Sequence, residues 1–292
     1  MAVRSLAIAA ALSALIACPA AAEDFAPSSA WTLDYDDDSC ALRRMFGAGE
    51  NRVYLEFRRF EPDTSLQIVI ASERMNARNP SNFRYRFSSE ADWRDTPGIN
   101  ITLDNEFSGV IFNTVLFRTP EGMTDPDRDA YLRSIDWRAQ EREIVSRTDA
   151  ITLRGAYRRE LTLQLGPMGP PMAALNECID ELMTHWDIDV EAHKTLTRAA
   201  IPIDYTSSSS MLDYPPKMLL RSMPGLVNIR LAIDETGRIT GCHIQMPLSD
   251  PEFEESSCAD IQHAFEFEPA LDKDGKPIAS YWVTGVRFII AQ

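Results

Sequence analysis

The first half of the chain has the hydrophobic pattern of short β-strands. Between residues 31 and 165, apolar and polar residues alternate over short runs, and turn residues separate the runs. The predicted strands are residues 31–35, 53–57, 66–70, 83–87, 99–103, 110–117, 151–153 and 161–165. Short alternating strands at this spacing predict a β-sandwich or a strongly bent sheet. Residues 127–143 are richer in helix formers and predict an inserted helix.

The pattern changes after residue 165. The three prolines of residues 166–171 cannot donate to a sheet ladder, and residues 172–186 then carry apolar side chains at helical spacing. Residues 199–212 have few apolar side chains and contain a serine run, which predicts a flexible linker. The expected domains are therefore residues 23–198, which are β-rich with a closing helix, and residues 213–292.

Beyond the predicted linker, the pattern is that of a small mixed unit. Tyr214-Pro215-Pro216 opens a short helix at residues 217–222, because proline suits the first helical turn. Alternate apolar positions in residues 226–233 predict a first strand. The turn Asp234-Glu235-Thr236-Gly237 leads into a second strand, and Gly237 is free to adopt positive φ there.

The last elements are a helix that begins at Pro251 and a strand over residues 278–290. A strand–helix–strand crossover should place this final strand beside the first strand, at an edge of the sheet. Its apolar side chains are expected to fill the core, so the functional interest of the strand lies in its main chain.

The cysteines predict two disulfides. Apart from Cys18 the chain has four cysteines, an even number that suits an oxidising compartment. Cys242 lies on the inward face of a strand and Cys258 on the inward face of the helix that covers it, so these two should pair. Their loop of roughly fifteen residues is worth about 3 kcal/mol in the chain-entropy model. By elimination, Cys40 pairs with Cys178 and ties the N-terminal sheet to the following helix.

The first residues have the pattern of an export signal. Arg4 precedes an apolar run over residues 6–17, and Ala20-Ala21-Ala22 offers a small-residue cleavage site. This predicts a signal peptide at residues 1–22 and a soluble periplasmic protein, because no second long apolar run follows. A second interpretation stays open, since the four residues that end at Cys18 also fit a lipoprotein signal that would leave Cys18 lipidated.

Four short motifs of the C-terminal region occur in an order typical of one family. They are Tyr214-Pro215, the turn that ends at Gly237, Phe267-Glu268-Pro269-Ala270, and Gly275-Lys276-Pro277. In this order they resemble the C-terminal domain of TonB, the periplasmic adaptor that grips outer-membrane transporters. The resemblance covers about residues 213–290 and implies a three-stranded antiparallel sheet with two helices. The whole chain is therefore expected to be α+β, with a sandwich-like N-terminal domain before this module.

The resemblance also implies a mode of binding. In TonB the last strand pairs with a short segment of the transporter, and an open strand edge offers unpaired N–H and C=O groups for this purpose. We expect a non-enzymatic protein whose partner-binding residues are Ser280, Tyr281, Trp282, Val283 and Thr284. The expected partner is an envelope protein or peptide strand; an outer-membrane transporter, cell-wall material and a second copy in a homodimer all stay open.

Two departures from TonB bear on this expectation. TonB keeps its N-terminal helix as an inner-membrane anchor, whereas the signal here has a cleavage site. TonB also has a long proline-rich spacer, whereas the predicted linker at residues 199–212 is short. Force transmission from the inner membrane is therefore not expected, while binding through a strand edge is unaffected.

Motifs that carry chemistry are absent from the sequence. None of the four histidines belongs to an H-E-x-x-H motif, and no G-x-S-x-G elbow occurs. Asp34, Asp36 and Asp38 alternate like calcium ligands, but Ser39 and Met45 stand where the loop needs glycine and glutamate. We therefore expect no metal and no cofactor. The formal charge of −15 argues against nucleic acid as a partner.

An alternative function also stays open. Folding can bring two carboxylates together without leaving a sequence motif, so acid–base chemistry has no necessary signature in the chain. Under this alternative the protein is an envelope enzyme or inhibitor, with its active surface on the N-terminal domain and the C-terminal module as a docking aid.

Overall fold

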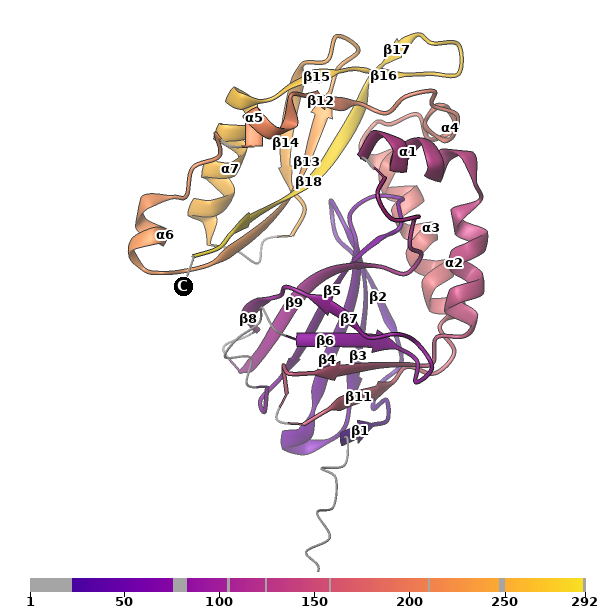
Figure 1. Cartoon of the computed structure of the whole chain (residues 1–292), viewed down its shortest axis with the longest axis vertical. Coiled ribbons are helices and arrows are strands. Elements are labelled where there is room, and N and C mark those ends of the chain that lie inside the picture. Colours follow the sequence, from indigo (N-terminus) through magenta and orange to yellow (C-terminus); the bar gives the residue numbers. More distant parts are fainter. Residues whose placement is uncertain are drawn as a thin grey trace, which may run out of the picture.

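The computed structural model describes residues 23–75, 83–103, 106–123, 125–157, 159–209, 211–246 and 250–290. The predicted signal peptide and Cys18 lie outside the described residues. The described chain forms a β-rich N-terminal sandwich, and a smaller C-terminal sheet packs against one end of it (Figure 1). The α+β fold class is confirmed.

Two sheets make up the sandwich. Within the described residues, the first has the order β2 (Thr32–Tyr35), β3 (Cys40–Phe46), β4 (Val53–Arg59), β5 (Ser65–Ser72), β9 (Phe107–Val115) and β8 (Ile99–Leu103). The second has the order β1 (Glu23–Phe25), β11 (Leu161–Gln164), β10 (Ala150–Arg154), β6 (Phe83–Phe87) and β7 (Arg94–Thr96). Phe83 and Phe112 meet between the sheets with their ring centroids 4.9 Å apart. They belong to one continuous core, so the predicted sandwich is confirmed.

All of the predicted N-terminal strands are present, but the prediction missed β1, β3 and β7. Strand β3 was missed because Arg43 and Arg44 interrupt its apolar run. Arg43 forms ion pairs with Asp34 and Glu56. The guanidinium of Arg44 stacks over the ring of Trp31, 5.2 Å from its centroid. Partners supplied by neighbouring strands thus make two charges compatible with a central strand, and this cannot be read from the strand itself.

The helices lie along one side of the sandwich (Figure 1). The single predicted helix at 127–143 is wrong, because the structure has α1 (Asp125–Ser134) and α2 (Trp137–Ser146). The side chain of Asp136 accepts a hydrogen bond from the N–H of Ala139 and starts the second helix. The predicted helix after the prolines is confirmed as α3 (Gly169–His185), and a short helix α4 (Val190–Lys194) follows it.

Buried polar contacts and a disulfide hold these helices to the first sheet. Arg59 of β4 pairs with Glu141 of α2 and donates a hydrogen bond to Asn176 of α3 at 2.5 Å. The predicted disulfide between Cys40 and Cys178 is confirmed and joins β3 to α3. The helices are therefore an integral layer of the N-terminal sandwich.

The predicted flexible linker at 199–212 is wrong. It contains β12 (Ile201–Ile203), which pairs antiparallel with β15 (Glu266–Glu268), and α5 (Tyr205–Ser209), which packs against α7 (Pro251–Ala264). Composition misled the prediction because the segment is held by main-chain pairing and by a few apolar contacts, such as that of Tyr205 with Phe265. This segment is part of the C-terminal unit.

The C-terminal sheet has the order β14 (Ile239–Ile244), β13 (Gly225–Ile233) and β18 (Ser280–Phe288). These described strands form the expected three-stranded antiparallel sheet, with the expected helices α6 (Pro216–Leu220) and α7. The predicted final strand is divided, because β17 (Pro277–Ile278) pairs with β16 (Ala270–Leu271) before β18 begins. The predicted disulfide between Cys242 and Cys258 is confirmed and joins β14 to α7.

Candidate strand-addition site

Strand β18 lies at an edge of the C-terminal sheet. Among the described strands, it pairs with β13 alone, from Ser280 opposite Ile233 to Phe288 opposite Gly225. The expected position of the last strand beside the first is therefore confirmed. One side of its main chain is left for another strand.

The register shows which main-chain groups of β18 face the open side. The N–H of Gln245 donates to the carbonyl of Asn228 at 2.9 Å, so the polar groups of Asn228 face β14. Because these groups alternate in direction along an antiparallel strand, those of Ile229 face β18 and bond its partner, Thr284. The immediate neighbours of Thr284 and every second residue beyond them therefore turn their N–H and C=O groups outward. They are Tyr281, Val283, Gly285 and Arg287, and outside the strand ladders the hydrogen bonds among described residues include none to their main-chain groups.

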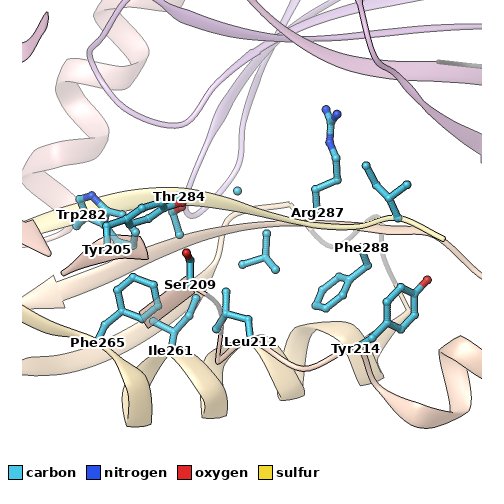
Figure 2. A pocket seen from close by; sticks show the side chains of 13 residues that line it. Tyr205, Ser209, Leu212, Tyr214, Ile261, Phe265, Trp282, Thr284, Arg287 and Phe288 are labelled. Carbon is cyan, nitrogen blue, oxygen red and sulfur yellow. The ribbon is translucent and has the colours of Figure 1, made fainter. Parts of the chain in front are cut away.

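A cavity of about 290 Å³ lies beside the C-terminal half of β18 (Figure 2). Its floor comes from α7, one wall from the inward face of β18, and the other wall from α5 and the segment after it. The lining residues are Ile261, Phe265, Trp282, Thr284, Val286, Phe288, Tyr205, Ser209, Leu212 and Tyr214, with Gly285, Arg287 and Ile289 completing the set. The open edge thus borders a hollow whose lining residues are mostly apolar or aromatic, although polar atoms make up more of its exposed surface. Such a hollow can receive side chains from an added strand.

The five residues predicted to bind a partner fall into two groups. Trp282 and Thr284 line the cavity, and Val283 lies between them on the open edge. Ser280 and Tyr281 are covered by α4. The side chain of His193 lies 2.8 Å from the Ser280 hydroxyl and stacks on the ring of Tyr281. The N-terminal end of β18 is therefore closed by the N-terminal part of the chain, and the accessible edge begins near Val283.

Sequence reasoning missed the other half of the site. Gly285, Arg287 and Ile289 extend the edge toward the end of the chain, and Tyr205 and Leu212 come from the segment expected to be a linker. The side chain of Ile289 is 60% exposed, and it alternates with the residues of the last strand that were expected to fill the core. The signal that could have revealed this half of the site was an apolar residue at the exposed end of an edge strand.

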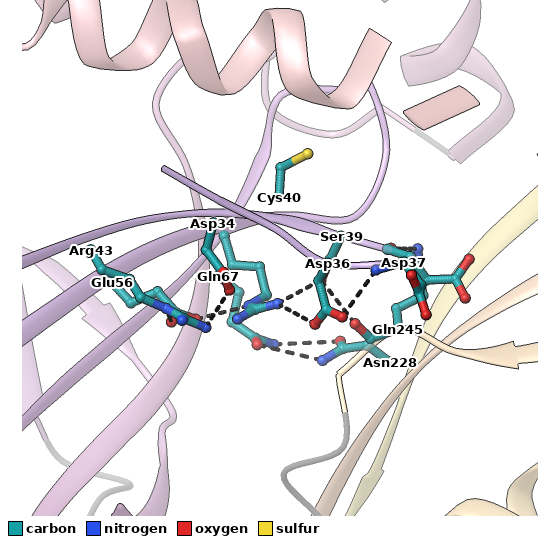
Figure 3. Close-up of polar contacts among 12 residues, drawn as sticks. Asp34, Asp36, Asp37, Ser39, Cys40, Arg43, Glu56, Gln67, Asn228 and Gln245 are labelled. Atoms are coloured by element: carbon teal, nitrogen blue, oxygen red, sulfur yellow. Dashed lines mark hydrogen bonds and ion pairs between the residues drawn. The ribbon is translucent and has the colours of Figure 1, made fainter. Parts of the chain in front are cut away.

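The face of the C-terminal sheet opposite α7 makes polar contacts with the sandwich, among them that between Asn228 and Gln67 (Figure 3). Arg230 donates two hydrogen bonds to one oxygen of Asp38, at 2.9 and 2.6 Å. Its guanidinium also stacks on Trp186, 4.3 Å from the ring centroid. The amide of Gln245 donates to the carbonyls of Asp38 and Phe60. The sheet is thus packed between α7 and the sandwich, so its free edge has a fixed orientation.

A charged network supports this interface from within the sandwich. Glu56 of β4 is almost fully buried and accepts hydrogen bonds from Arg58, Arg43 and Tyr54. Burial raises the pKa of the Glu56 carboxyl, but Arg58 and the other donors outweigh this effect and hold the pKa below its ordinary value. Arg58 also donates to the hydroxyl of Ser39, which donates to the carbonyl of Gln245 at 2.9 Å.

The aspartates that alternate like calcium ligands have arginine partners. Asp34 pairs with Arg43, Asp36 with Arg58, and Asp38 with Arg230. Within the described residues, no group of three or more His, Cys, Asp or Glu side chains could hold a metal ion. No helix in the same described ranges is both long and apolar enough to cross a membrane.

Comparison with known proteins agrees with the geometry of this sheet. Residues 210–290 match the family described as Gram-negative bacterial TonB protein C-terminal. The C-terminal domain is TonB-like. The match confirms the resemblance and covers less than a third of the chain, so it assigns nothing to the N-terminal sandwich. No curated protein matches the chain. In the TonB-like domain the two described helices α6 and α7 and the sheet of β13, β14 and β18 all fall inside the matched range.

Proposed function

We propose that this chain is a non-enzymatic periplasmic protein whose TonB-like domain binds an extended segment of an envelope partner by adding it as a strand to β18. The partner is an envelope protein such as an outer-membrane transporter. The observation that carries the proposal is the open edge from Val283 to Arg287 beside a cavity lined mostly by apolar and aromatic residues. The family match supports this mode of binding, and the two disulfides suit the oxidising periplasm.

In this proposal the N-terminal sandwich holds the TonB-like sheet in place. Its contacts through Arg230, Asn228 and Gln245 hold the second face of the TonB-like sheet, so a guest strand meets an edge that is already ordered. An ordered edge lowers the entropic cost of binding, because only the guest must lose conformational freedom. The sandwich thus acts as a base that presents β18.

Substitution of Val283 by proline tests strand addition directly. Its N–H faces the open edge, so proline removes a donor that the guest would use while leaving the ladder to β13 intact. The matched control is Val283→Ala, which removes the side chain and keeps the donor. Both variants are checked for wild-type thermal unfolding before use.

The assay is capture of detergent-solubilised envelope proteins by the immobilised full chain, with quantitative mass spectrometry of what is retained. We expect specific partners to be retained by the wild type and by Val283→Ala, and to be lost with Val283→Pro. Equal capture by all three folded proteins would contradict strand addition at this edge. Analytical ultracentrifugation of the same proteins reports whether the guest is a second copy.

A further inference from the structure

Arg287 is a cation without a carboxylate partner at the open edge. Among the described residues it forms no ion pair, and its side chain makes one long hydrogen bond, from Nη2 to the carbonyl of Pro97 at 3.5 Å. It differs in this from arginines that pair with carboxylates, such as Arg59 and Arg154, in a chain with 44 acidic and 29 basic residues. Partial burial lowers the pKa of the Arg287 guanidinium, so the charge is desolvated without compensation.

The position of Arg287 relates this charge to a guest strand. Its main-chain groups face the open edge, as the register of β18 requires, and its side chain points away from the cavity toward the sandwich (Figure 2). In a paired strand, the guest residue opposite Arg287 places its side chain on the same face, about 5 Å away at Cβ. The guest residues on either side, opposite Val286 and Phe288, turn to the cavity face.

We propose that the guest strand carries an acidic residue between two apolar residues, with its carboxylate on Arg287 and the flanking side chains in the cavity. This inference rests on the proposed function, because it assumes that a strand adds to β18. In the cavity wall, the partly exposed side chains of Leu212 and Tyr214 offer apolar surface to the flanking residues. A charge-assisted hydrogen bond is stronger than one between neutral groups, so at this half-buried site a carboxylate should bind Arg287 more tightly than a neutral side chain would.

The same feature discriminates against a second copy as the guest. Strand β18 has the sequence SYWVTGVRF and contains no carboxylate. Two copies paired through β18 would therefore leave both Arg287 side chains without a partner. When the axis falls at Arg287 itself, the two cations face each other, which is unfavourable in cross-strand pairs.

Three synthetic peptides test the inference. They have the sequence Gly-Thr-Val-X-Val-Thr-Gly with blocked ends, and X is Glu, Gln or Lys. Each is titrated into the uniformly ¹⁵N-labelled full chain, and binding is followed by the amide signals of Val283, Gly285 and Arg287. For the wild type we expect the Glu peptide to bind about tenfold more tightly than the Gln peptide, and the Lys peptide more weakly than either.

Two variants assign this preference to Arg287. With Arg287→Gln, the Glu and Gln peptides should bind equally well, and with Arg287→Glu the Lys peptide should become the tightest. The matched control is Arg238→Gln, which removes one exposed positive charge near the turn between β13 and β14, at the other end of the sheet. It should keep the wild-type preference. Arg287→Lys keeps the charge and should keep the preference for the Glu peptide, and Arg287→Glu carries the test if Arg287→Gln is poorly folded.

The outcomes separate this inference from the proposed function. If the Glu and Gln peptides bind the wild type equally and both move the edge amides, the charge preference is overturned while strand addition stands. If no peptide shifts these amide signals, the acidic–apolar recognition is overturned. The capture experiment with Val283→Pro then tests strand addition by itself. A preference for Glu that survives in Arg287→Gln also overturns the assignment.

Discussion

The ion pair between Arg230 and Asp38 is the contact on which the arrangement of the two parts should depend most. The side chain of Arg230 is 6% exposed and that of Asp38 is 16% exposed, so the pair is shielded from water. Substitution of Asp38 by alanine would leave a buried guanidinium with no carboxylate partner. Breaking a buried pair in this way costs about 3–5 kcal/mol. Because Asp38 is partly accessible, water can reach the site, and we expect about 3 kcal/mol.

A second substitution separates the cost of the unpaired charge from the value of the pair. In the double variant Asp38→Ala with Arg230→Met, no charge is left unpaired, and the methionine can still pack against the ring of Trp186. Replacement of a buried ion pair by apolar side chains is often nearly neutral. We therefore expect the double variant to recover to within about 1 kcal/mol of the wild type.

Urea unfolding followed by both far-ultraviolet circular dichroism and tryptophan fluorescence measures these free energies. Two probes are needed because a chain with more than one core need not unfold in one step. The control is Asp37→Ala, whose exposed side chain is adjacent in sequence, and it should stay within about 0.5 kcal/mol of the wild type. A value below about 1 kcal/mol for Asp38→Ala alone, or a double variant less stable than the single one, would refute the reasoning.

Three further predictions follow from local features. Replacement of Cys242 and Cys258 by serine should lower the free energy of unfolding by about 3 kcal/mol, measured by urea unfolding against the wild type with and without reductant. Burial lowers the pKa of His193 from its ordinary 6.5, so the unfolded chain binds the proton more readily and stability should fall as the pH drops below about 6.5. His193→Gln should flatten this fall in thermal unfolding between about pH 7 and 5, and an unchanged slope would count against it. Gly237 has φ of +85°, and a Cβ added there would lie 2.1 Å from the carbonyl oxygen of Phe267. Gly237→Ala should therefore lower the Tm clearly in calorimetry, and an unchanged Tm would contradict the clash.

The site could be predicted from the sequence in part. The motif order placed a TonB-like module and its edge strand correctly, because turn glycines, prolines and alternating apolar positions act over short distances along the chain. The accessible part of that edge was not predictable in the same way. Ser280 and Tyr281 are closed by His193, which lies more than eighty residues earlier in the chain, and no local pattern reports such a contact.

The same division holds for the fold as a whole. Local periodicity by itself determined most of the sandwich strands, the three-stranded C-terminal sheet with its two helices, and the Cys242–Cys258 disulfide, since each depends on which face a side chain occupies. The Cys40–Cys178 disulfide followed by elimination. Only the tertiary structure decided that β3 tolerates two arginines and that the segment around β12 is paired with β15. It also decided that the second face of the TonB-like sheet is buried against the sandwich, through polar contacts such as that of Arg230 and an apolar cluster that includes Leu226. In each of these cases the stabilising partner comes from a distant part of the chain, so the free energy that selects the conformation is absent from any local stretch of sequence.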